Sequence, residues 1–380
     1  MPVRGPWCAA HFARVWRACR EGGRARAGAQ DGECRRRMNE NAAGRRKEDH
    51  IDIVLSGDRV ASRVDAGFDR WRFVHCALPE LSLDAIDLST RMLGRRLKAP
   101  LLISAMTGGP ARSEAINAHL AEAAQALGIA LGVGSQRIAV ETGAAAGLGG
   151  ELRRRAPDAL LFANLGAAQL LSPSGRDHAR RAVEMIGADA LVIHLNPLQE
   201  AIQEGGDRDW HGVLHAITGL CATLRAPVVV KEVGFGLSAA VGRRLVNCGV
   251  AGLDVAGAGG TNWALVEGAR GSGRTQALAS AFADWGIPTA DAVVDLRAAL
   301  PDIPIIASGG IRDGVDAAKA IRLGADLVGQ AAATLKAAVT STEAVIAHFE
   351  VLVEQLRIAA FAAGAGNLAA LRGVPLVEAR

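Results

Sequence analysis

The chain has 380 residues, of which 50% are apolar and 4% aromatic, and its formal net charge at pH 7 is +4. This length can bury a large core and accommodates a (β/α)8 barrel of roughly 250 residues with extensions. No uninterrupted apolar run reaches the roughly 18 residues that a membrane span needs, so we interpret the protein as soluble, with no membrane partner.

The positive charge is concentrated in residues 1–37, which hold nine Arg against three acidic residues. The rest of the chain is close to neutral, and nothing in it indicates a nucleic-acid partner. None of the six Cys stands at a metal-binding spacing, so we expect reduced thiols and a cytoplasmic location.

Residues 1–37 lack both an apolar period and a secretory apolar core. We expect this segment to be a disordered tail, or upstream sequence translated ahead of a true start at Met38. Residues 38–98 are predicted to form an N-terminal arm or flap. Residues 99–380 are predicted to form a catalytic barrel that is followed by helices.

From residue 99 onward, apolar strand-like runs alternate with helical patterns. The predicted strands span 100–106, 130–135, 160–166, 190–196, 227–234, 252–257, 304–310 and 326–331. Helical patterns cover 113–128, 237–249 and 315–325 between them, and 342–376 after the last strand. This alternation predicts a (β/α)8 TIM barrel, and a doubly wound sheet is the alternative because strands are hard to count from sequence.

Polar residues and glycines follow almost every predicted strand. In a barrel these positions meet at one mouth, where active sites lie, so the pattern indicates an enzyme. The residues concerned are Ser104, Thr107, Ser135, Gln136, Arg137, Asn164, His194, Asn196, Gln199, Glu200, Lys231, Asp254, Gly257, Gly259, Gly260, Thr261, Ser308, Gly309, Gly310, Gly329 and Ala331.

Three of these side chains crowd behind the fourth predicted strand. Alone, His194 would more often be a packed histidine, Gln199 a surface amide and Glu200 a solvated carboxylate at a helix start. Their proximity favours a functional interpretation of all three. Glu200 would suit Mg²⁺ that is also bridged to substrate phosphates, since Mg²⁺ prefers oxygen ligands.

The glycine-rich segments 307–314 and 328–332 follow the last two predicted strands. Barrels commonly bind phosphate there, because glycines let backbone N–H groups approach an anion; the alternative is a pair of ordinary glycine turns. Lys231 ends a run of Val residues. It is either a cation beneath a cofactor such as a reduced flavin, or part of an ion pair with Glu232 or Asp254.

A charge run, Arg46-Lys47-Glu48-Asp49-His50, precedes the barrel. It is either a solvated surface or an arm that folds over the mouth and binds a polyanion through Arg46 and Lys47, together with Arg137.

Ten motifs of this chain are similar, in order, to those of the type 2 isopentenyl-diphosphate Δ-isomerases, which are FMN-dependent (β/α)8 barrels. The two most specific are HLNPLQE at 194–200 and GDRDW at 206–210. The others are RKEDHI at 46–51, SAMTGG at 104–109, GVGSQR at 132–137, NLGAAQ at 164–169, KEVGFG at 231–236, DVAGAGGTNW at 254–263, ASGGIR at 307–312 and VGQAA at 328–332.

The resemblance implies a set of roles. FMN would contact Ala105, Met106, Thr107, Ser135, Asn164, Lys231 and Thr261, and its phosphate would contact Gly309, Gly310, Ala331 and Ala332. The substrate would contact Arg46, Lys47, Ser135, Gln136, Arg137 and Gln199. Glu200 would bind Mg²⁺, and Gln199 and His194 would be catalytic.

The family converts isopentenyl diphosphate to dimethylallyl diphosphate. It uses reduced FMN, obtained with NADPH or another reductant, although the net reaction is redox-neutral, and it is usually a homo-oligomer, here expected as a tetramer or octamer. Ala256 stands where we expect Ser, and Gln330-Ala331-Ala332 lacks a glycine often found there. A third departure is Gly205, which stands where Pro-Glu-Gly-Asp is more usual. We expect these departures to weaken FMN retention.

Two other classes are alternatives. Another FMN-dependent barrel oxidoreductase is the first: a 2-hydroxy-acid oxidase would need a His and an Arg where this chain has GAGGTNW. An inosine monophosphate dehydrogenase would need a nucleophilic Cys in a glycine-rich loop, whereas Cys221 and Cys248 lie in predicted helices. The second is a non-catalytic barrel that binds FMN or a phosphometabolite, in which Gln199 and Glu200 should have been lost.

Overall fold

The computed structural model describes residues 47–105, 111–143 and 147–378. The chain divides into two units, Met1–Glu48 and Asp49–Arg380, and the fold described below is that of the second unit. Residues 1–37 lie outside the described residues, so the expectation for that segment stays a prediction.

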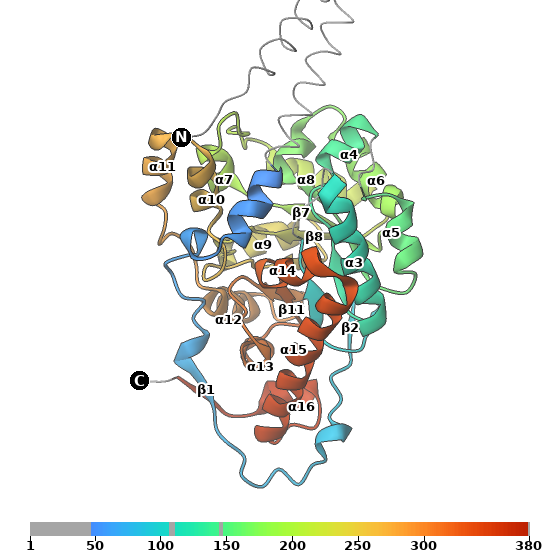
Figure 1. Cartoon of the computed structure of the whole chain (residues 1–380), viewed down its shortest axis with the longest axis vertical. Helices are drawn as coiled ribbons and strands as arrows, with labels where there is room; N and C mark the ends of the chain where they lie inside the picture. Colours follow the sequence, from blue (N-terminus) through green and yellow to red (C-terminus); the bar gives the residue numbers. More distant parts are fainter. Residues whose placement is uncertain (1–46, 106–110, 144–146, 379–380) are drawn as a thin grey trace, which may run out of the picture. The chain divides into compact units, whose positions relative to one another are not determined.

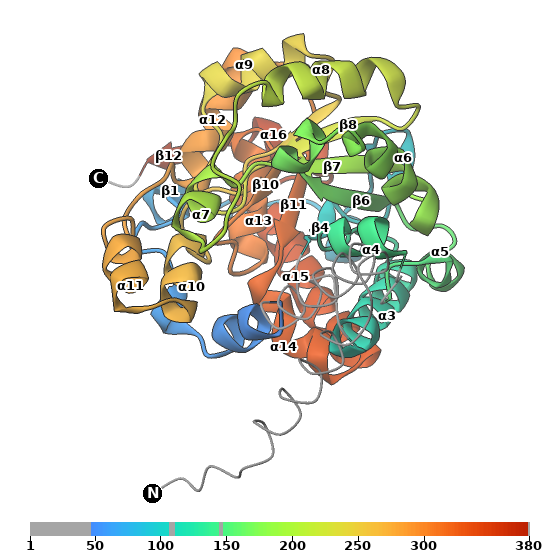
Figure 2. The same cartoon turned by 90° about the horizontal axis from the view of Figure 1, so that it is seen from above.

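The second unit is built on a closed barrel of eight strands in the order β4-β5-β6-β7-β8-β9-β10-β11, with helices around it (Figures 1 and 2). Neighbouring strands are parallel, and pairing of β11 with β4 closes the ring. The strands are β4 (Leu101–Ile103), β5 (Ala130–Gly132), β6 (Leu161–Gly166), β7 (Ala190–His194), β8 (Val228–Lys231), β9 (Gly252–Asp254), β10 (Ile305–Ser308) and β11 (Leu327–Gln330). The (β/α)8 prediction is confirmed, and closure excludes a doubly wound sheet.

Helices connect the strands and continue after the last one. They are α3 (Ala111–Leu127), α4 (Arg137–Thr142), α5 (Gly150–Arg155), α6 (Gly175–Ile186), α7 (Pro197–Ile202), α8 (Val213–Thr223), α9 (Ala239–Asn247), α10 (Trp263–Arg270), α11 (Gly273–Ser280), α12 (Thr289–Ala299), α13 (Gly314–Leu323), α14 (Ala332–Thr340), α15 (Thr342–Ala362) and α16 (Leu368–Gly373). None of the helices within the described ranges is long and apolar enough to cross a bilayer.

Residues 49–98 combine a helical stretch at 49–55 with several short, separate elements. These are η1 (Asp58–Val60), η2 (Phe68–Arg70), β1 (Trp71–Phe73), η3 (Leu83–Ala85), β2 (Thr90–Met92) and β3 (Arg95–Leu97); a further turn, η4 (Ala167–Leu171), follows β6. β1 pairs antiparallel with β12 (Leu376–Glu378), so the last part of the chain is a strand as well as helices.

The hairpin of β2 and β3 fills the N-terminal end of the barrel. Met92 and Leu97 form one buried cluster with interior strand residues such as Leu102, Phe162 and Ile306. The hairpin therefore closes the end of the barrel opposite the mouth, which leaves the C-terminal ends of the strands as the place for a site.

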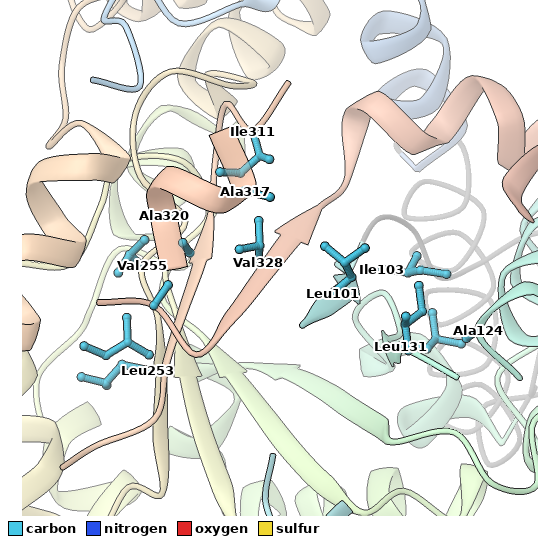
Figure 3. Close-up of a cluster of buried hydrophobic side chains, with 14 of the residues drawn as sticks. Leu101, Ile103, Ala124, Leu131, Leu253, Val255, Ile311, Ala317, Ala320 and Val328 are labelled. Atoms are coloured by element: carbon cyan, nitrogen blue, oxygen red, sulfur yellow. The ribbon is translucent and has the colours of Figure 1, made fainter. Parts of the chain in front are cut away.

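Side chains alternate between the two faces of each strand, as the pleat requires. Leu101 and Ile103 belong to the cluster between strands and helices, whereas Leu102 belongs to the interior cluster. Figure 3 shows the outer layer, in which strand residues such as Val328 face helical residues such as Ala317. This alternation decides which side chains at the C-terminal ends of the strands enter the mouth.

Two matched arginine clamps hold β6 to β7 and β10 to β11 at their N-terminal ends. Arg153 of α5 donates to the carbonyls of Gly187, Ala156, Pro157 and Ala159, and to Asp189 Oδ2 at 2.8 Å. Asp189 Oδ2 also accepts from the backbone N–H of Leu161 at 2.9 Å. One side chain thereby satisfies several carbonyls and one partly buried carboxylate.

Arg297 of α12 repeats the arrangement in the second half of the barrel. It donates to the carbonyls of Gly324, Leu300, Pro301 and Ile303, and to Asp326 Oδ2 at 2.6 Å. Asp326 Oδ2 likewise accepts from the N–H of Ile305 at 2.9 Å. The two clamps stabilise equivalent strand pairs.

Replacing Arg153 with Met should lower the free energy of unfolding by about 2–4 kcal/mol, because several carbonyls lose a donor and the partly buried Asp189 carboxylate loses one of its two arginine partners. Arg154→Met is the matched control: its side chain is 72% exposed and pairs with Glu151, so the loss should stay below about 0.5 kcal/mol. Urea unfolding of both variants measures this. Equal losses would contradict the clamp.

Candidate functional site

One layer of side chains at the C-terminal ends of the strands faces the interior of the barrel. In β7, Leu191 and Ile193 belong to the outer cluster and Val192 to the interior cluster, so His194 is the next side chain directed inward. The same alternation directs inward Ser104, Gly132, Asn164, Lys231, Asp254, Ser308 and Gly329. A polar layer therefore lies above the apolar interior.

Asn164 and His194 are bonded to each other across β6 and β7. Asn164 Nδ2 donates to the carbonyl of Val133 at 2.9 Å, which leaves its Oδ1 as the acceptor from His194 Nδ1 at 2.8 Å. The neutral imidazole then carries its lone pair on Nε2. The pairing fixes both the tautomer and the plane of His194.

Gln136 lies directly behind this pair and is fully buried. Its Oε1 accepts from the backbone N–H of Asn164 at 3.0 Å, and its Nε2 donates to the carbonyl of Ala182 in α6 at 2.9 Å. The structure thus directs the Gln136 side chain toward α6 and makes it a support for Asn164.

Lys231 and two carboxylates occupy the adjoining strand ends. Lys231 Nζ donates to the carbonyl of Glu232 at 2.5 Å, and the Glu232 carboxylate instead accepts three backbone N–H groups at 2.6–2.7 Å. Burial raises the pKa of Asp254, while the charge of Lys231 and the Ser308 hydroxyl, 2.6 Å from Asp254 Oδ1, oppose the rise. Neither carboxylate forms a close ion pair with Lys231 among the described residues.

Gln199 is held at both ends of its amide. Its Oε1 accepts from Asn196 Nδ2 at 3.2 Å, and its Nε2 donates to Glu267 Oε1 in α10 at 2.9 Å. The same Glu267 oxygen accepts from His50 Nε2 at 3.0 Å, and Arg270 donates to Oε2 at 2.7 Å. This network fixes the direction of the Gln199 amide, which is 9% exposed.

Glu267 is a buried anion. Burial raises the pKa of its carboxyl, but His50, Gln199 and Arg270 outweigh burial and lower the pKa to about 2. The side chain is 1% exposed, and Asn262 caps the start of α10 through Leu265 N–H at 3.1 Å. At working pH Glu267 therefore accepts hydrogen bonds and does not donate a proton.

In the part of the chain that the structure describes, only neutral donors hold Glu200. Asn196 Nδ2 donates to its Oε1 at 3.0 Å, while Gln203 Nε2 and the backbone N–H of Asp207 donate to Oε2 at 3.2 and 2.8 Å. No cluster of three or more metal-binding side chains occurs within the residues that the structure describes. A cation at Glu200 would need oxygen ligands from a bound molecule or water.

The glycine-rich ends of β10 and β11 pack tightly against neighbouring loops. A Cβ on Gly310, where φ is +69°, would lie 2.6 Å from backbone atoms of Gly259, and one on Gly329 would lie 2.3 Å from Ser104 Oγ. Within the described ranges, the backbone N–H groups of Gly310, Ala332 and Ala333 have no hydrogen-bond acceptor. These donors are suited to an anion.

The comparisons with known proteins identify the family. The family model of FMN-dependent dehydrogenases matches residues 45–152 and 160–376. The isopentenyl-diphosphate delta-isomerase of Xanthobacter autotrophicus is 79% identical over 89% of this chain and 99% of its own length. Those of Stutzerimonas stutzeri and of a Synechocystis species are 65% and 50% identical, over 90% and 87% of this chain and 99% and 95% of their own lengths.

The chain belongs to the FMN-dependent isopentenyl-diphosphate delta-isomerase family. The fold is shared more widely: a mandelate oxidase variant with (S)-mandelic acid is 18% identical with a TM-score of 0.60, over 90% of this chain and 98% of that one. A second, with benzaldehyde, is 19% identical with a TM-score of 0.62, over 87% and 94%. This likeness concerns the barrel alone.

The residues at the mouth fit FMN. Ser104 Oγ is buried at the end of β4 and has no partner among the described residues, and Lys231 supplies a cation in the same layer. The backbone N–H groups suited to an anion lie just after β10 and β11, where Gly310 packs against Gly259 in the loop that follows β9. A flavin with a phosphate therefore finds polar, cationic and anion-binding groups in one mouth.

The other predicted residues fall into two groups. Ala105, Ser135, Arg137 and Thr261 lie in the segments that follow β4, β5 and β9, and Arg137 donates to Asp207 Oδ2 at 3.2 Å. The remaining predictions concern residues that cannot be placed at the mouth: Arg46, Met106 and Thr107 lie outside the described residues, and Lys47 belongs to the unit that ends at Glu48.

Sequence reasoning missed Glu267 and named His50 only within a charge run. Glu267 follows no strand; it lies within the helical pattern of α10, where a carboxylate ordinarily faces solvent. The only signal in the sequence is its position four residues after Trp263. In the structure the Trp263 ring lies edge-on to the His50 ring, with 5.2 Å between the centroids.

Replacing Glu267 with Gln tests the buried anion. Because folding lowers the pKa from 4.5 to about 2, the carboxylate stabilises the fold above pH 4.5, and this contribution is lost as pH falls toward 2. The variant should be less stable by about 3 kcal/mol at pH 7, and the difference should shrink by pH 3. Urea midpoints at both pH values measure it; a difference independent of pH would contradict it. The exposed Glu204→Gln is the control.

Proposed function

We propose that the chain converts isopentenyl diphosphate to dimethylallyl diphosphate by a 1,3-proton shift that requires reduced FMN and Mg²⁺, with NADPH as reductant. The observation that carries the proposal is the fixed Gln199 amide, held between Asn196 and the buried anion Glu267 beside the mouth. The names of the close relatives support the substrate.

When bound, reduced FMN supplies the acid and base chemistry at the alkene. Ser104, Asn164 and Lys231 would lie at its ring system, and Gly309, Gly310, Ala331 and Ala332 would hold its phosphate. Alkene carbons are poor proton partners, so the protein must hold the substrate in a dry, fixed geometry. The polar layer lies directly above the apolar interior of the barrel, and this arrangement suits the requirement.

Gln199 would orient the substrate alkene or relay a proton, and its fixed amide lowers the entropic cost of either role. His194, whose tautomer Asn164 fixes, would accept a proton at Nε2 and could then return it from the same nitrogen. Glu267 holds Gln199 and balances the charge of Arg270 and of His50 when protonated. None of these roles requires Glu267 itself to change protonation.

Glu200 would hold Mg²⁺ through one carboxylate, and the diphosphate and water would supply the other ligands. Arg46, Lys47, Ser135 and Arg137 would bind the diphosphate, and Gln136 would act through Asn164. The proposal also includes a homo-oligomer, tetrameric or octameric, in the cytoplasm. For the oligomeric state and the location, the proposal rests on the resemblance to the family.

An anaerobic assay tests the proposal. Protein with FMN, NADPH, Mg²⁺ and isopentenyl diphosphate should form dimethylallyl diphosphate, and oxidised FMN should support none. Gln199→Met should lower kcat by about a hundredfold while the fold is kept, because a positioned proton-transfer group is lost. Gln125→Met, at the outer end of α3, should leave kcat unchanged. Product with oxidised FMN, or full activity of Gln199→Met, would contradict the proposal.

Glu200→Gln tests the metal role. The neutral amide keeps the shape but loses the charge that attracts a divalent cation, so the Mg²⁺ concentration for half-maximal rate should rise by roughly tenfold or more. FMN binding should not change, because among the described residues the Glu200 carboxylate bonds only to Asn196, Gln203 and Asp207. Titration of the rate with Mg²⁺ measures this, and an unchanged Mg²⁺ requirement would exclude Glu200 as the ligand.

A further inference from the structure

Gln330 is the last residue of β11, and its side chain points away from the barrel interior. Leu327 belongs to the interior cluster and Val328 to the outer one, so Gly329 faces the mouth and Gln330 faces the helices. The side chain is nonetheless only 3% exposed. A buried amide in the helical layer needs partners for both its ends.

Gln330 has such partners, and they come from different parts of the chain. Its Nε2 donates to the carbonyl of Ile311 at 3.0 Å, in the loop after β10. Its Oε1 lies 2.7 Å from Nε2 of His348, in α15. Figure 3 places Ile311 close to Ala317 of α13 and to Val328 of β11. The amide therefore ties two strand ends to an outer helix.

The hydrogen bond to Ile311 fixes the role of His348. Because Gln330 Nε2 must donate to a carbonyl, Oε1 must accept, and His348 Nε2 must carry its proton. The imidazole is half-buried and lies edge-on to Phe349 at 5.2 Å between centroids. His348 thus holds the Gln330 amide in one orientation.

The two ends of this connection adjoin the anion-binding backbone segments. Ile311 directly follows Gly309 and Gly310, and Gln330 directly precedes Ala331 and Ala332. Backbone donors bind an anion well only when their spacing is held, since they cannot adjust individually. A single side chain thus spans the two segments from their outer side.

We propose that Gln330, held by His348, is a positioning residue that sets the spacing of the two backbone segments around the FMN phosphate. The proposal rests on the FMN site proposed above. It makes the pair selective for a flavin with a phosphate, because the Gln330 side chain and His348 bond to each other and to Ile311 on the outer side of the barrel. Gln330 meets Ser104 through its backbone carbonyl, which accepts from the Ser104 N–H at 2.8 Å and which the substitutions leave in place. Gln330 and His348 touch neither flavin nor substrate.

The test compares FMN with riboflavin, which has the same ring system but no phosphate. Gln330→Met keeps the length of the side chain without its hydrogen bonds, and His348→Phe keeps a ring without its donor. His348→Gln keeps a donor and should restore part of the loss. His119→Phe is the matched control, because His119 bonds to the Ala338 carbonyl in the far half of α14 at 2.8 Å. Fluorescence titration of each protein with both flavins measures the dissociation constants.

Gln330→Met and His348→Phe should raise the FMN dissociation constant roughly tenfold, as expected for one buried hydrogen bond, and leave that of riboflavin within about twofold. His119→Phe should change neither. A proportional loss for both flavins, or no loss for FMN, would overturn the positioning role; if Gln330→Met does not fold, the His348→Phe and His348→Gln pair decides. Wild-type protein that binds the two flavins equally would instead reject the phosphate site itself, and wild-type protein that binds neither would reject the proposed function.

Discussion

Pairing of β11 with β4 is the constraint on which the site depends. Val328, Gly329 and Gln330 lie in register with Leu101, Leu102 and Ile103, and this contact closes eight parallel strands into one ring. In a closed ring every strand ends at the same mouth, and the period of two decides which residues enter it. Closure thus brings Ser104, from the first strand, beside Gly329 of the last, although they are more than 200 residues apart in sequence.

The mouth combines fixed amides with buried charges of both signs. Asn164 and Gln199 are bound to protein groups at both ends of the amide, and Asn196 is bound through its Nδ2, so none needs to reorganise when a ligand enters. The Glu267 anion pairs with the Arg270 cation and is hydrogen-bonded to His50, and Lys231 is bound to a backbone carbonyl instead of a carboxylate. Its charge is therefore not neutralised by a close ion pair within the described part of the chain. Such a site suits an anionic ligand, whose negative charge would balance that of Lys231.

Much of the fold and part of the site could be predicted from the sequence, because both follow from local patterns. Each predicted strand overlaps an observed one but is longer than it. The excess is clear at 130–135, 227–234, 252–257 and 304–310, mainly because the last residues leave the ladder as loops. The β1–β12 pairing and the hairpin below the barrel could not be predicted, because such contacts join distant segments without a local signal. The same holds for Glu267, which lies in a helix. Gln136 was predicted at a strand end, but sequence alone does not reveal that its side chain turns toward α6.

Isotope incorporation from solvent tests the central claim most directly. Reduced holoenzyme would convert isopentenyl diphosphate in D₂O, and mass spectrometry would measure deuterium in the dimethylallyl diphosphate formed. A proton shift that adds a proton at one alkene carbon and removes one at another predicts deuterium in the product, because the acid and base exchange with solvent. Product formed without deuterium would contradict the account.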